Sequence, residues 1–275
     1  MPARLRALLE GPEEAVCLAE AALLVAAGEY RDLDVADYLA RLQAYADAVE
    51  ARLEPQAGTE ERLGALNQYL FQELGFAPDP DDYYDPRNSF LNEVLERRRG
   101  IPISLSIVYI AVGRRLGLDL KGVAFPGHFL VKCHVDGGVV VLDPYYGGVS
   151  LSLEDLQQRL RDARGVEVSR AVVSEMLVAA APREVLLRML RNLKGIYVKQ
   201  SKWPSALGVL EWIVGVAPRE AEEIRDRGMV YEALECWRPA AADYQQYLAL
   251  SPMVADADAV RERVVEMRKR SAQLN

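Results

Sequence analysis

The 275-residue sequence predicts an α+β domain over residues 1–178, followed by an all-helical domain over residues 179–275. Three observations support this prediction. Apolar residues recur at helical spacing before residue 75, short β-branched and aromatic runs gather between residues 120 and 142, and an internal repeat occupies the C-terminal part. A chain of this length has room for two such domains.

The first part of the chain, from Glu13 to about Leu74, has the pattern of a group of amphipathic helices. After a break rich in aspartate, Asn88-Ser89 is expected to cap a helix that runs to Arg99 and stops at Gly100. The cations Arg97 to Arg99 then complement the dipole of its last turn, or alternatively contact a ligand.

Pro102 suits the first position of a helix, and Ile103–Leu116 is apolar on most of its circumference, which predicts a buried central helix. Three strands should follow, at Leu120–Phe125, Phe129–Val135 and Val139–Leu142. Asp136-Gly137 between the last two is a strong hairpin signal, so the sheet is expected to be small and antiparallel. Ser152 and Asp155 have the spacing of a capping box that begins the next helix.

The C-terminal part repeats itself every 34 residues. Six residue pairs keep this offset: Tyr197/Tyr231, Trp203/Trp237, Ala206/Ala240, Leu210/Tyr244, Val214/Leu248 and Pro218/Pro252. This is the period of the tetratricopeptide helix–turn–helix, whose units stack to bury their apolar faces. We therefore expect two units, a capping helix over Asp256–Leu274, and both tryptophans hidden in equivalent places as core residues rather than ligand contacts.

Composition excludes several classes of protein. The net charge of −8 argues against a nucleic-acid or anionic-membrane binder. The most apolar stretch, Ala21–Ala27, is far too short to span a bilayer, and no signal peptide precedes it, so we expect a cytoplasmic protein. Cys17, Cys133 and Cys236 are odd in number and widely spaced, which predicts no disulfide framework, no metal site and no cofactor.

The hairpin register places His128 and Asp143 on one face of the predicted sheet. If Asp136-Gly137 form the turn, His128 becomes a diagonal cross-strand neighbour of Asp143, within reach of a hydrogen bond. Such a pair either orients an imidazole for catalysis or simply fastens the hairpin. Cys133 has the opposite parity and should fill the core, and His134 is too far along the strand to share a metal with His128.

Several motifs together resemble one family. They are Arg99–Ser106 (RGIPISLS), Arg114–Leu118 (RRLGL), Gly122–Phe129 (GVAFPGHF) and Leu142–Tyr146 (LDPYY). They are similar to the bacterial SirB-type proteins, which combine a transglutaminase-like, papain-related domain with C-terminal tetratricopeptide-like repeats. A similar segment occurs in a eukaryotic F-box protein group. The resemblance implies this fold for the α+β domain and a role in protein contacts as much as in catalysis.

The resemblance also implies a site. His128 and Asp143 match the second and third members of the superfamily's catalytic triad, but Pro102 stands where active members have cysteine. Ser104 and Ser106 follow at the start of the predicted central helix, where their hydroxyls either cap the helix or act as a nucleophile. Pro102 and Ser106 are also expected to line the binding cleft. Four tyrosines and one arginine should line it with them, either as contacts to a peptide or anion or as packing: Tyr83, Tyr84, Arg87, Tyr145 and Tyr146.

Two functions follow from these patterns. The leading hypothesis is a cytoplasmic scaffold or regulatory protein that has lost the catalytic cysteine and binds a protein or peptide partner. The alternative is an active hydrolase or acyl transferase that acts on a peptide or amide through Ser104, His128 and Asp143. Binding of nucleic acid through Arg97 to Arg99 is the weakest reading, because of the acidic net charge.

Overall fold

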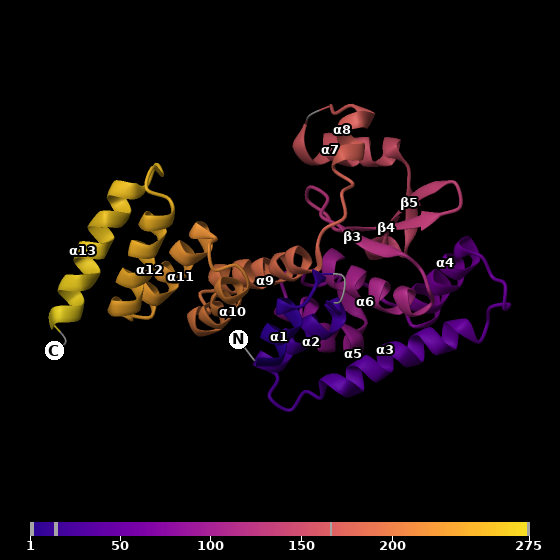
Figure 1. The fold of residues 1–275 in the computed structure, drawn as a ribbon, viewed down its shortest axis with the longest axis horizontal. Helices are drawn as coiled ribbons and strands as arrows, with labels where there is room; N and C mark the ends of the chain where they lie inside the picture. Colours follow the sequence, from indigo (N-terminus) through magenta and orange to yellow (C-terminus); the bar gives the residue numbers. More distant parts are fainter. Residues whose placement is uncertain (1–2, 14–15, 166, 274–275) are drawn as a thin grey trace. The chain divides into compact units, whose positions relative to one another are not determined.

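A computed structural model describes residues 3–13, 16–165 and 167–273 of the chain (Figure 1). The chain divides into two compact units, Ala7–Met189 and Leu190–Asn275 with Met1–Arg6. The first unit contains the strands and the second is helical. The α+β class followed by helical repeats is therefore confirmed, whereas the predicted domain boundary at residue 178 stays a prediction.

The N-terminal segment is helical, as its apolar spacing predicted. The helix α2 is apolar around its whole circumference and is accordingly buried from Leu18 to Ala26, with only Glu20 partly exposed. The helix α3 begins at Asp34, whose carboxylate accepts a hydrogen bond from the Ala36 amide at 2.8 Å. The elements are α1 (Ala3–Glu10), α2 (Leu18–Glu29), α3 (Val35–Glu50), α4 (Thr59–Asn67) and a π-helical turn, η2 (Gln68–Glu73).

The predicted helix from Asn88 to Arg99 is wrong at both ends. The helix α5 covers only Leu91–Arg97, and Asn88 belongs to a 3-10 turn, η3 (Pro86–Asn88). Arg98 ends the helix in the left-handed conformation, with φ 56°, in place of the predicted Gly100. The physical reason is a strand pairing that the pattern did not predict: β2 (Arg99–Gly100) leaves the helix to pair in parallel with β1 (Ala77–Pro78).

The three arginines after this helix do not lie together in a last helical turn. The Arg98 guanidinium donates to the carbonyl oxygen of Leu74 at 2.9 Å, and that of Arg99 donates to the carbonyl of Gly75 at 2.8 Å. Arg97 alone occupies the last turn of α5. Arg98 and Arg99 therefore fasten the preceding loop, and only Arg97 lies where it can complement the helix dipole.

The central helix and the hairpin are as predicted. The helix α6 (Pro102–Arg115) starts with Pro102 at its first turn and is buried without interruption as far as Gly113. Val135 pairs with Gly138 across Asp136-Gly137, where Gly137 has φ 93°. The four antiparallel strands follow in the order β3 (Leu120–Val123), β4 (Leu130–Val135), β5 (Gly138–Asp143) and β6 (Val149–Leu151), of which β6 was not predicted.

Helices cover both faces of this sheet (Figure 1). On one face α6 lies so close that a Cβ at Gly113 would overlap a methyl group of Leu120, so any larger residue there would force that side chain to move. On the other face Val123, Leu130 and Val141 form an apolar cluster with residues of α7 (Leu153–Arg164) and α8 (Arg170–Glu175). The capping box of Ser152 and Asp155 that begins α7 is confirmed.

The second unit shows the 34-residue repeat in its backbone. Ser201 and Glu235, 34 positions apart, have φ angles of 54° and 57°. The following amides also correspond, because Lys202 donates to the Tyr197 carbonyl at 2.9 Å and Cys236 to the Tyr231 carbonyl at 2.8 Å. The helices are α9 (Pro182–Lys199), which runs across the boundary between the units, α10 (Trp203–Val216), α11 (Ala221–Ala233), α12 (Trp237–Leu250) and the capping helix α13 (Ala257–Gln273).

Charged contacts join the successive repeats. Glu223 of α11 is only 5% exposed and accepts from Arg191 and Lys194 of α9, each at 2.7 Å. Arg225, 34 residues after Arg191, reaches Asp256 before α13 at 3.2 Å. Buried carboxylates with two cationic donors are well compensated, so these contacts fix which helices neighbour one another.

The two tryptophans are equivalent in position but are not hidden, and that part of the prediction is wrong. Trp203 and Trp237 are the first residues of α10 and α12, and both are only partly buried. A residue at the end of a helix lies at the margin of the stacked layer, where its neighbours cover one side only. The Trp237 ring packs under the Arg270 guanidinium, 5.0 Å from its centroid.

Two glycines in the repeats test this packing. We expect Gly228→Ala to lower the free energy of unfolding by about 1–3 kcal/mol, since its Cβ would lie 3.0 Å from the buried Tyr244 ring. Gly208→Ala is the matched control, with nothing within 4 Å of the added carbon. It should stabilise α10 by about 0.5–1 kcal/mol.

Tryptophan fluorescence during urea unfolding measures both changes, because all three tryptophans, Trp203, Trp212 and Trp237, belong to this unit. Equal effects of the two substitutions would contradict the packing of α11 on α12 described above.

Candidate functional site

The predicted contact between His128 and Asp143 is present. The imidazole Nε2 lies 2.9 and 3.0 Å from the two carboxylate oxygens of Asp143, which is fully buried. Asp143 ends β5 and caps the 3-10 turn η4 (Pro144–Tyr146), where its carboxylate also accepts from the Tyr145 amide at 3.1 Å. The end of the strand and the start of the turn therefore hold the acceptor in place.

A third group, which the sequence did not single out, also binds this carboxylate. Arg159 of α7 donates to Asp143 Oδ2 at 2.5 Å. Burial by itself raises the pKa of Asp143, but the hydrogen bonds and charges of His128 and Arg159 outweigh burial and lower it. Asp143 is therefore an ionised carboxylate with two strong donors.

The imidazole of His128 is held by rings as well as by Asp143. Tyr145 meets it edge-on, with centroids 5.6 Å apart, and Tyr146 stacks on it at 6.1 Å. Because Nε2 faces a carboxylate, the hydrogen-bond network assigns the proton of a neutral imidazole to Nε2. Nδ1 has no hydrogen-bond partner among the described residues, so it is free to accept from an incoming group.

The serines of α6 make no hydrogen bond to this pair. The Ser104 hydroxyl is fully buried, donates to the Asn88 carbonyl at 2.6 Å and accepts from the Ile101 amide at 3.0 Å. The Ser106 hydroxyl is also buried, and within the described chain it has no partner at all. Pro102 is a buried helix-start residue with no reactive group. Ser104 therefore caps its helix, the first of the two roles considered for it.

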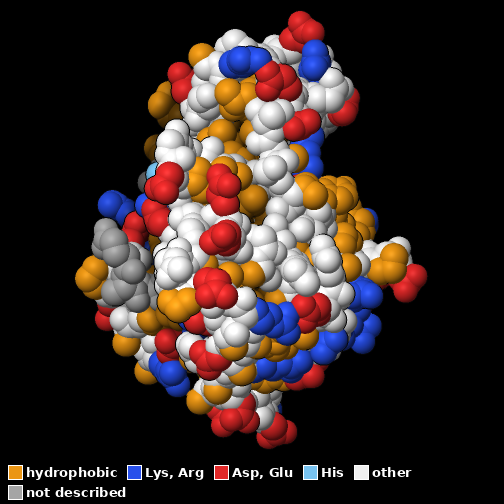
Figure 2. All heavy atoms as spheres, turned by 90° about the vertical axis from the view of Figure 1, so that its right-hand side faces the viewer, with side chains coloured by type: hydrophobic (Ala, Val, Ile, Leu, Met, Phe, Trp, Pro, Cys, Tyr) orange, Lys and Arg blue, Asp and Glu red, His pale blue; other side chains and the backbone are white. Residues whose placement is uncertain are grey.

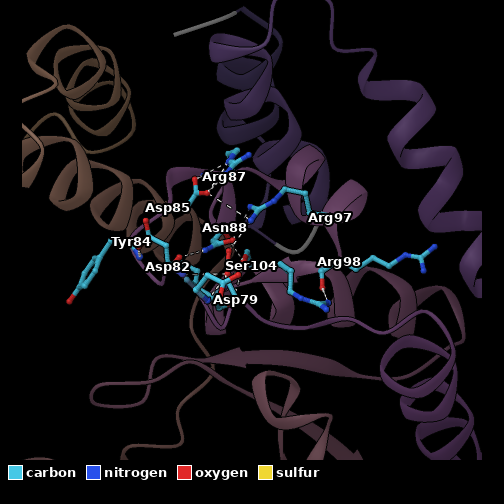
Figure 3. A network of polar contacts seen from close by, with 12 residues as sticks. Asp79, Asp82, Tyr84, Asp85, Arg87, Asn88, Arg97, Arg98 and Ser104 are labelled. Atoms are coloured by element: carbon cyan, nitrogen blue, oxygen red, sulfur yellow. Dashed lines mark hydrogen bonds and ion pairs between the residues drawn. The ribbon is translucent and has the colours of Figure 1, made fainter.

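Figure 3 shows the polar network in which Ser104 takes part. Arg97 is at its centre and donates to the Asn88 side-chain oxygen at 3.0 Å and to Asp79 at 2.8 Å. The Asn88 amide in turn donates to the Asp82 carbonyl at 2.7 Å. These bonds anchor the loop of residues 79–88 against the start of α6, and this loop carries Tyr83 and Tyr84.

Of the predicted cleft residues, the structure brings some together and separates one. Tyr83 and Tyr84 meet edge-on at 5.3 Å, and Tyr145 and Tyr146 at 5.1 Å. The strand β1, from which the loop with Tyr83 and Tyr84 starts, lies against η4, which carries Tyr145 and Tyr146, so the two pairs belong to neighbouring segments. Arg87 instead forms an ion pair with Asp85 in the loop network, and no contact of its side chain with the imidazole is seen in the described residues.

Arg188 of α9 is a further residue that sequence reasoning missed. Its Nη2 donates to the carbonyl oxygens of His128 at 2.7 Å and of Phe125 at 3.3 Å, and its guanidinium lies 5.6 Å from the Phe129 ring centroid. Neither Arg159 nor Arg188 belongs to a local motif, since each lies at least 15 residues from the groups it binds. Nothing in the sequence pattern marks them.

Cys133 does not supply a nucleophile to His128. Cys133 is buried, its thiol donates weakly to the His134 carbonyl at 3.5 Å, and burial raises its pKa. Its predicted role as core filling is confirmed. Cys236 lies in the repeat unit, and within the part of the chain that the structure describes, no three His, Cys, Asp or Glu side chains gather as metal ligands do.

Replacing Asp143 by asparagine tests the charge of this centre. We expect Asp143→Asn to cost about 3 kcal/mol of unfolding free energy at neutral pH, because Arg159 and His128 lose a buried ionised partner. The folded pKa of Asp143 lies below its unfolded value, so this stabilisation is complete above about pH 4. It is lost as the pH falls through the lowered value, so the gap between the two proteins should shrink at acid pH.

Pulse proteolysis along a urea series, read on peptides from β4 and β5, measures this gap. Asp162→Asn on the exposed side of α7 removes the same charge and serves as the control, which should change little at any pH. A gap that stays constant down to pH 2 would show that the charge of Asp143 does not stabilise the fold.

Comparison with known proteins agrees with this architecture. Residues 36–191 match the Transglutaminase-like superfamily, and residues 193–265 match the Tetratricopeptide repeat. Within the described residues, no helix has the length and apolarity to cross a membrane.

Bacterial relatives cover most of the chain. A UPF0162 protein of Xylella fastidiosa is 41% identical over 93% of this chain and 91% of its own length. A UPF0162 protein of Vibrio cholerae is 31% identical over 78% of this chain and 79% of its own length. F-box only protein 21 of Pongo abelii is 27% identical over 73% of this chain but only 32% of its own length. The chain thus belongs to the UPF0162 family, with a transglutaminase-like domain followed by tetratricopeptide repeats.

Proposed function

We propose that this protein is a cytoplasmic scaffold that binds a peptide segment of a partner protein at a transglutaminase-like site without a nucleophile. The observation that carries the proposal is the His128–Asp143 pair, which keeps a triad-like hydrogen bond while the Ser104 hydroxyl is engaged with Asn88. The resemblance of the motifs to SirB-type proteins is part of the same proposal.

The surroundings of Asp143 support a structural role for the pair. In a catalytic triad the carboxylate orients the imidazole and stabilises the positive charge that develops on it. Here Arg159 already binds the same carboxylate at 2.5 Å and partly neutralises it. A second cation at this position reduces the stabilisation that Asp143 can give to a positive charge on His128. The pair is therefore better suited to fixing the position of the imidazole than to transferring a proton.

The rings around His128 support peptide binding. Tyr83 is 47% exposed and Tyr146 57%, and Tyr146 stacks on the imidazole. Exposed tyrosines give large contact areas at low entropic cost and are typical of protein interfaces. On the face shown in Figure 2, acidic and basic side chains are interspersed, so its charge is mixed rather than uniformly basic.

The helical repeats are a second argument for a role in binding a partner protein. Tetratricopeptide units stack into extended surfaces that proteins use for binding. The relative with an F-box name carries the similar segment as about a third of its length. That arrangement fits a module used for contacts within larger proteins.

The alternative function, a hydrolase or acyl transferase, rests on the unpartnered Nδ1 of His128. To serve as nucleophile, Ser104 would have to give up its hydrogen bonds with Asn88 and Ile101 inside the core. The Ile101 amide and the Asn88 carbonyl would keep only their long mutual hydrogen bond of 3.4 Å, and losing the shorter bonds to Ser104 costs about 1–3 kcal/mol. General-base catalysis requires the hydroxyl within hydrogen-bond reach of the imidazole, and no such contact is present among the described residues.

A turnover assay separates the two functions. We expect p-nitrophenyl acetate and a glutamine peptide with an amine acceptor to react at the buffer rate with the wild type, Ser104→Ala and His128→Ala. Ser104→Ala should instead lower the unfolding free energy by about 1–3 kcal/mol, because the Ile101 amide and the Asn88 carbonyl lose their short bonds to the hydroxyl and keep only the 3.4 Å bond to each other.

Ser106→Ala is the matched control for stability, since this buried hydroxyl has no partner in the described chain and its loss should be close to neutral. A turnover that depends on Ser104 and rises with pH around about 6.5 would overturn the scaffold proposal. The binding half of the proposal is checked on arrays of random nonapeptides: the full chain should retain a subset, and Tyr146→Ala should lose it.

A further inference from the structure

Arg188 is a cation without an anion. Among the described residues no carboxylate lies within 4 Å of its guanidinium, in contrast to Arg97, which binds Asp79, and Arg159, which binds Asp143. Its recorded bonds go only to the two neutral carbonyls of Phe125 and His128. An arginine carries five N–H donors, so Nε and Nη1 remain available to a ligand.

The position of Arg188 adds to its value as an anion site. The carbonyl bonds fix its Nη2 beside His128, and the Phe129 ring supports the guanidinium from one side. Burial lowers the pKa of Arg188, and the nearby Tyr83 hydroxyl opposes that effect. A partly desolvated cation held in place by neutral groups gains more from a carboxylate than a solvated one does, because water competes less.

The groups next to Arg188 suit the rest of a peptide. The His128 carbonyl accepts from Arg188, and the His128 ring contacts Tyr145 and Tyr146. Burial raises the pKa of Tyr83, and the charge of Arg188 opposes that rise. His128 Nδ1 has no partner among the described residues and can accept a backbone N–H. Because Tyr83, Tyr84 and Tyr146 are about half exposed, the surface is open, and an extended chain can cross it without ending there.

Resting on the proposed function, we infer that this surface binds a peptide through an Asp or Glu side chain, whose carboxylate pairs with the Arg188 guanidinium while flanking residues pack on Tyr83, Tyr145 and Tyr146. The carboxylates of Asp79 and Asp143 repel an acidic peptide only weakly, since each of them forms an ion pair with an arginine. Among the cations next to these rings, Arg188 has no carboxylate partner in the described chain, while Asp81 and Asp82 beside Tyr83 form no ion pair with any described residue, so the bound carboxylate has to lie on the Arg188 side of that ring.

The test compares two nonapeptide arrays that are identical except for a central Glu or Gln, with acetylated and amidated ends. We expect the wild type to bind the Glu peptides about 10- to 100-fold more tightly than their Gln partners, the effect typical of a charged hydrogen bond. Arg188→Gln keeps an amide donor for the His128 carbonyl but removes the charge, and it should abolish the preference. Arg161→Gln, on exposed α7, is the charge-matched control and should keep it.

The outcomes are distinct. If no peptide binds, or if Tyr146→Ala changes nothing, the proposed function fails together with this inference. If peptides bind but Glu and Gln are equivalent on the wild type, the inference alone is overturned, and this comparison needs no variant to fold. An equal Glu preference in Arg188→Gln would likewise overturn it.

Discussion

The buried carboxylate of Asp143 is the interaction on which this region of the α+β unit depends. It accepts hydrogen bonds from His128, Arg159 and the Tyr145 amide, and so joins the segment before β4, the helix α7 and the turn after β5. An ionised group with no solvent exposure is costly unless its acceptor sites are filled, and here they are. The same bonds that compensate the charge also set the positions of the rings of Tyr145 and Tyr146.

A second polar centre holds the facing loop. Arg97 binds Asp79 and Asn88, and the Asn88 carbonyl receives the Ser104 hydroxyl at the start of α6. The two centres differ in what they leave unpaired. The Arg97 guanidinium is paired with Asp79, whereas next to Asp143 the Nδ1 of His128 has no described partner. The chemistry available to a ligand therefore lies on the His128 side.

Local signals predicted a large part of the fold and the central pair of the site. The Asp136-Gly137 turn fixed the register, and strand parity then placed His128 beside Asp143 and turned Cys133 into the core. The 34-residue spacing predicted equivalent turns, which the left-handed residues Ser201 and Glu235 confirm. These features were accessible because turn chemistry and periodicity act over short distances along the chain. Whether the candidate residues carry a function stays a prediction.

The rest depends on contacts between distant segments. The pairing of β1 with β2 overrode the expected stop at Gly100, and no local pattern shows that Arg98 adopts φ 56°. Arg159 and Arg188 lie on amphipathic helices, where arginine is common, so only the folded chain reveals which groups each guanidinium contacts.

The equivalent turns of the two repeats have a further consequence. Because Ser201 and Glu235 bend the backbone alike, one whole period can be duplicated at a boundary between helices without creating a new type of junction. The length of the helical array is thus a quantity that evolution, or an engineer, can change in whole steps.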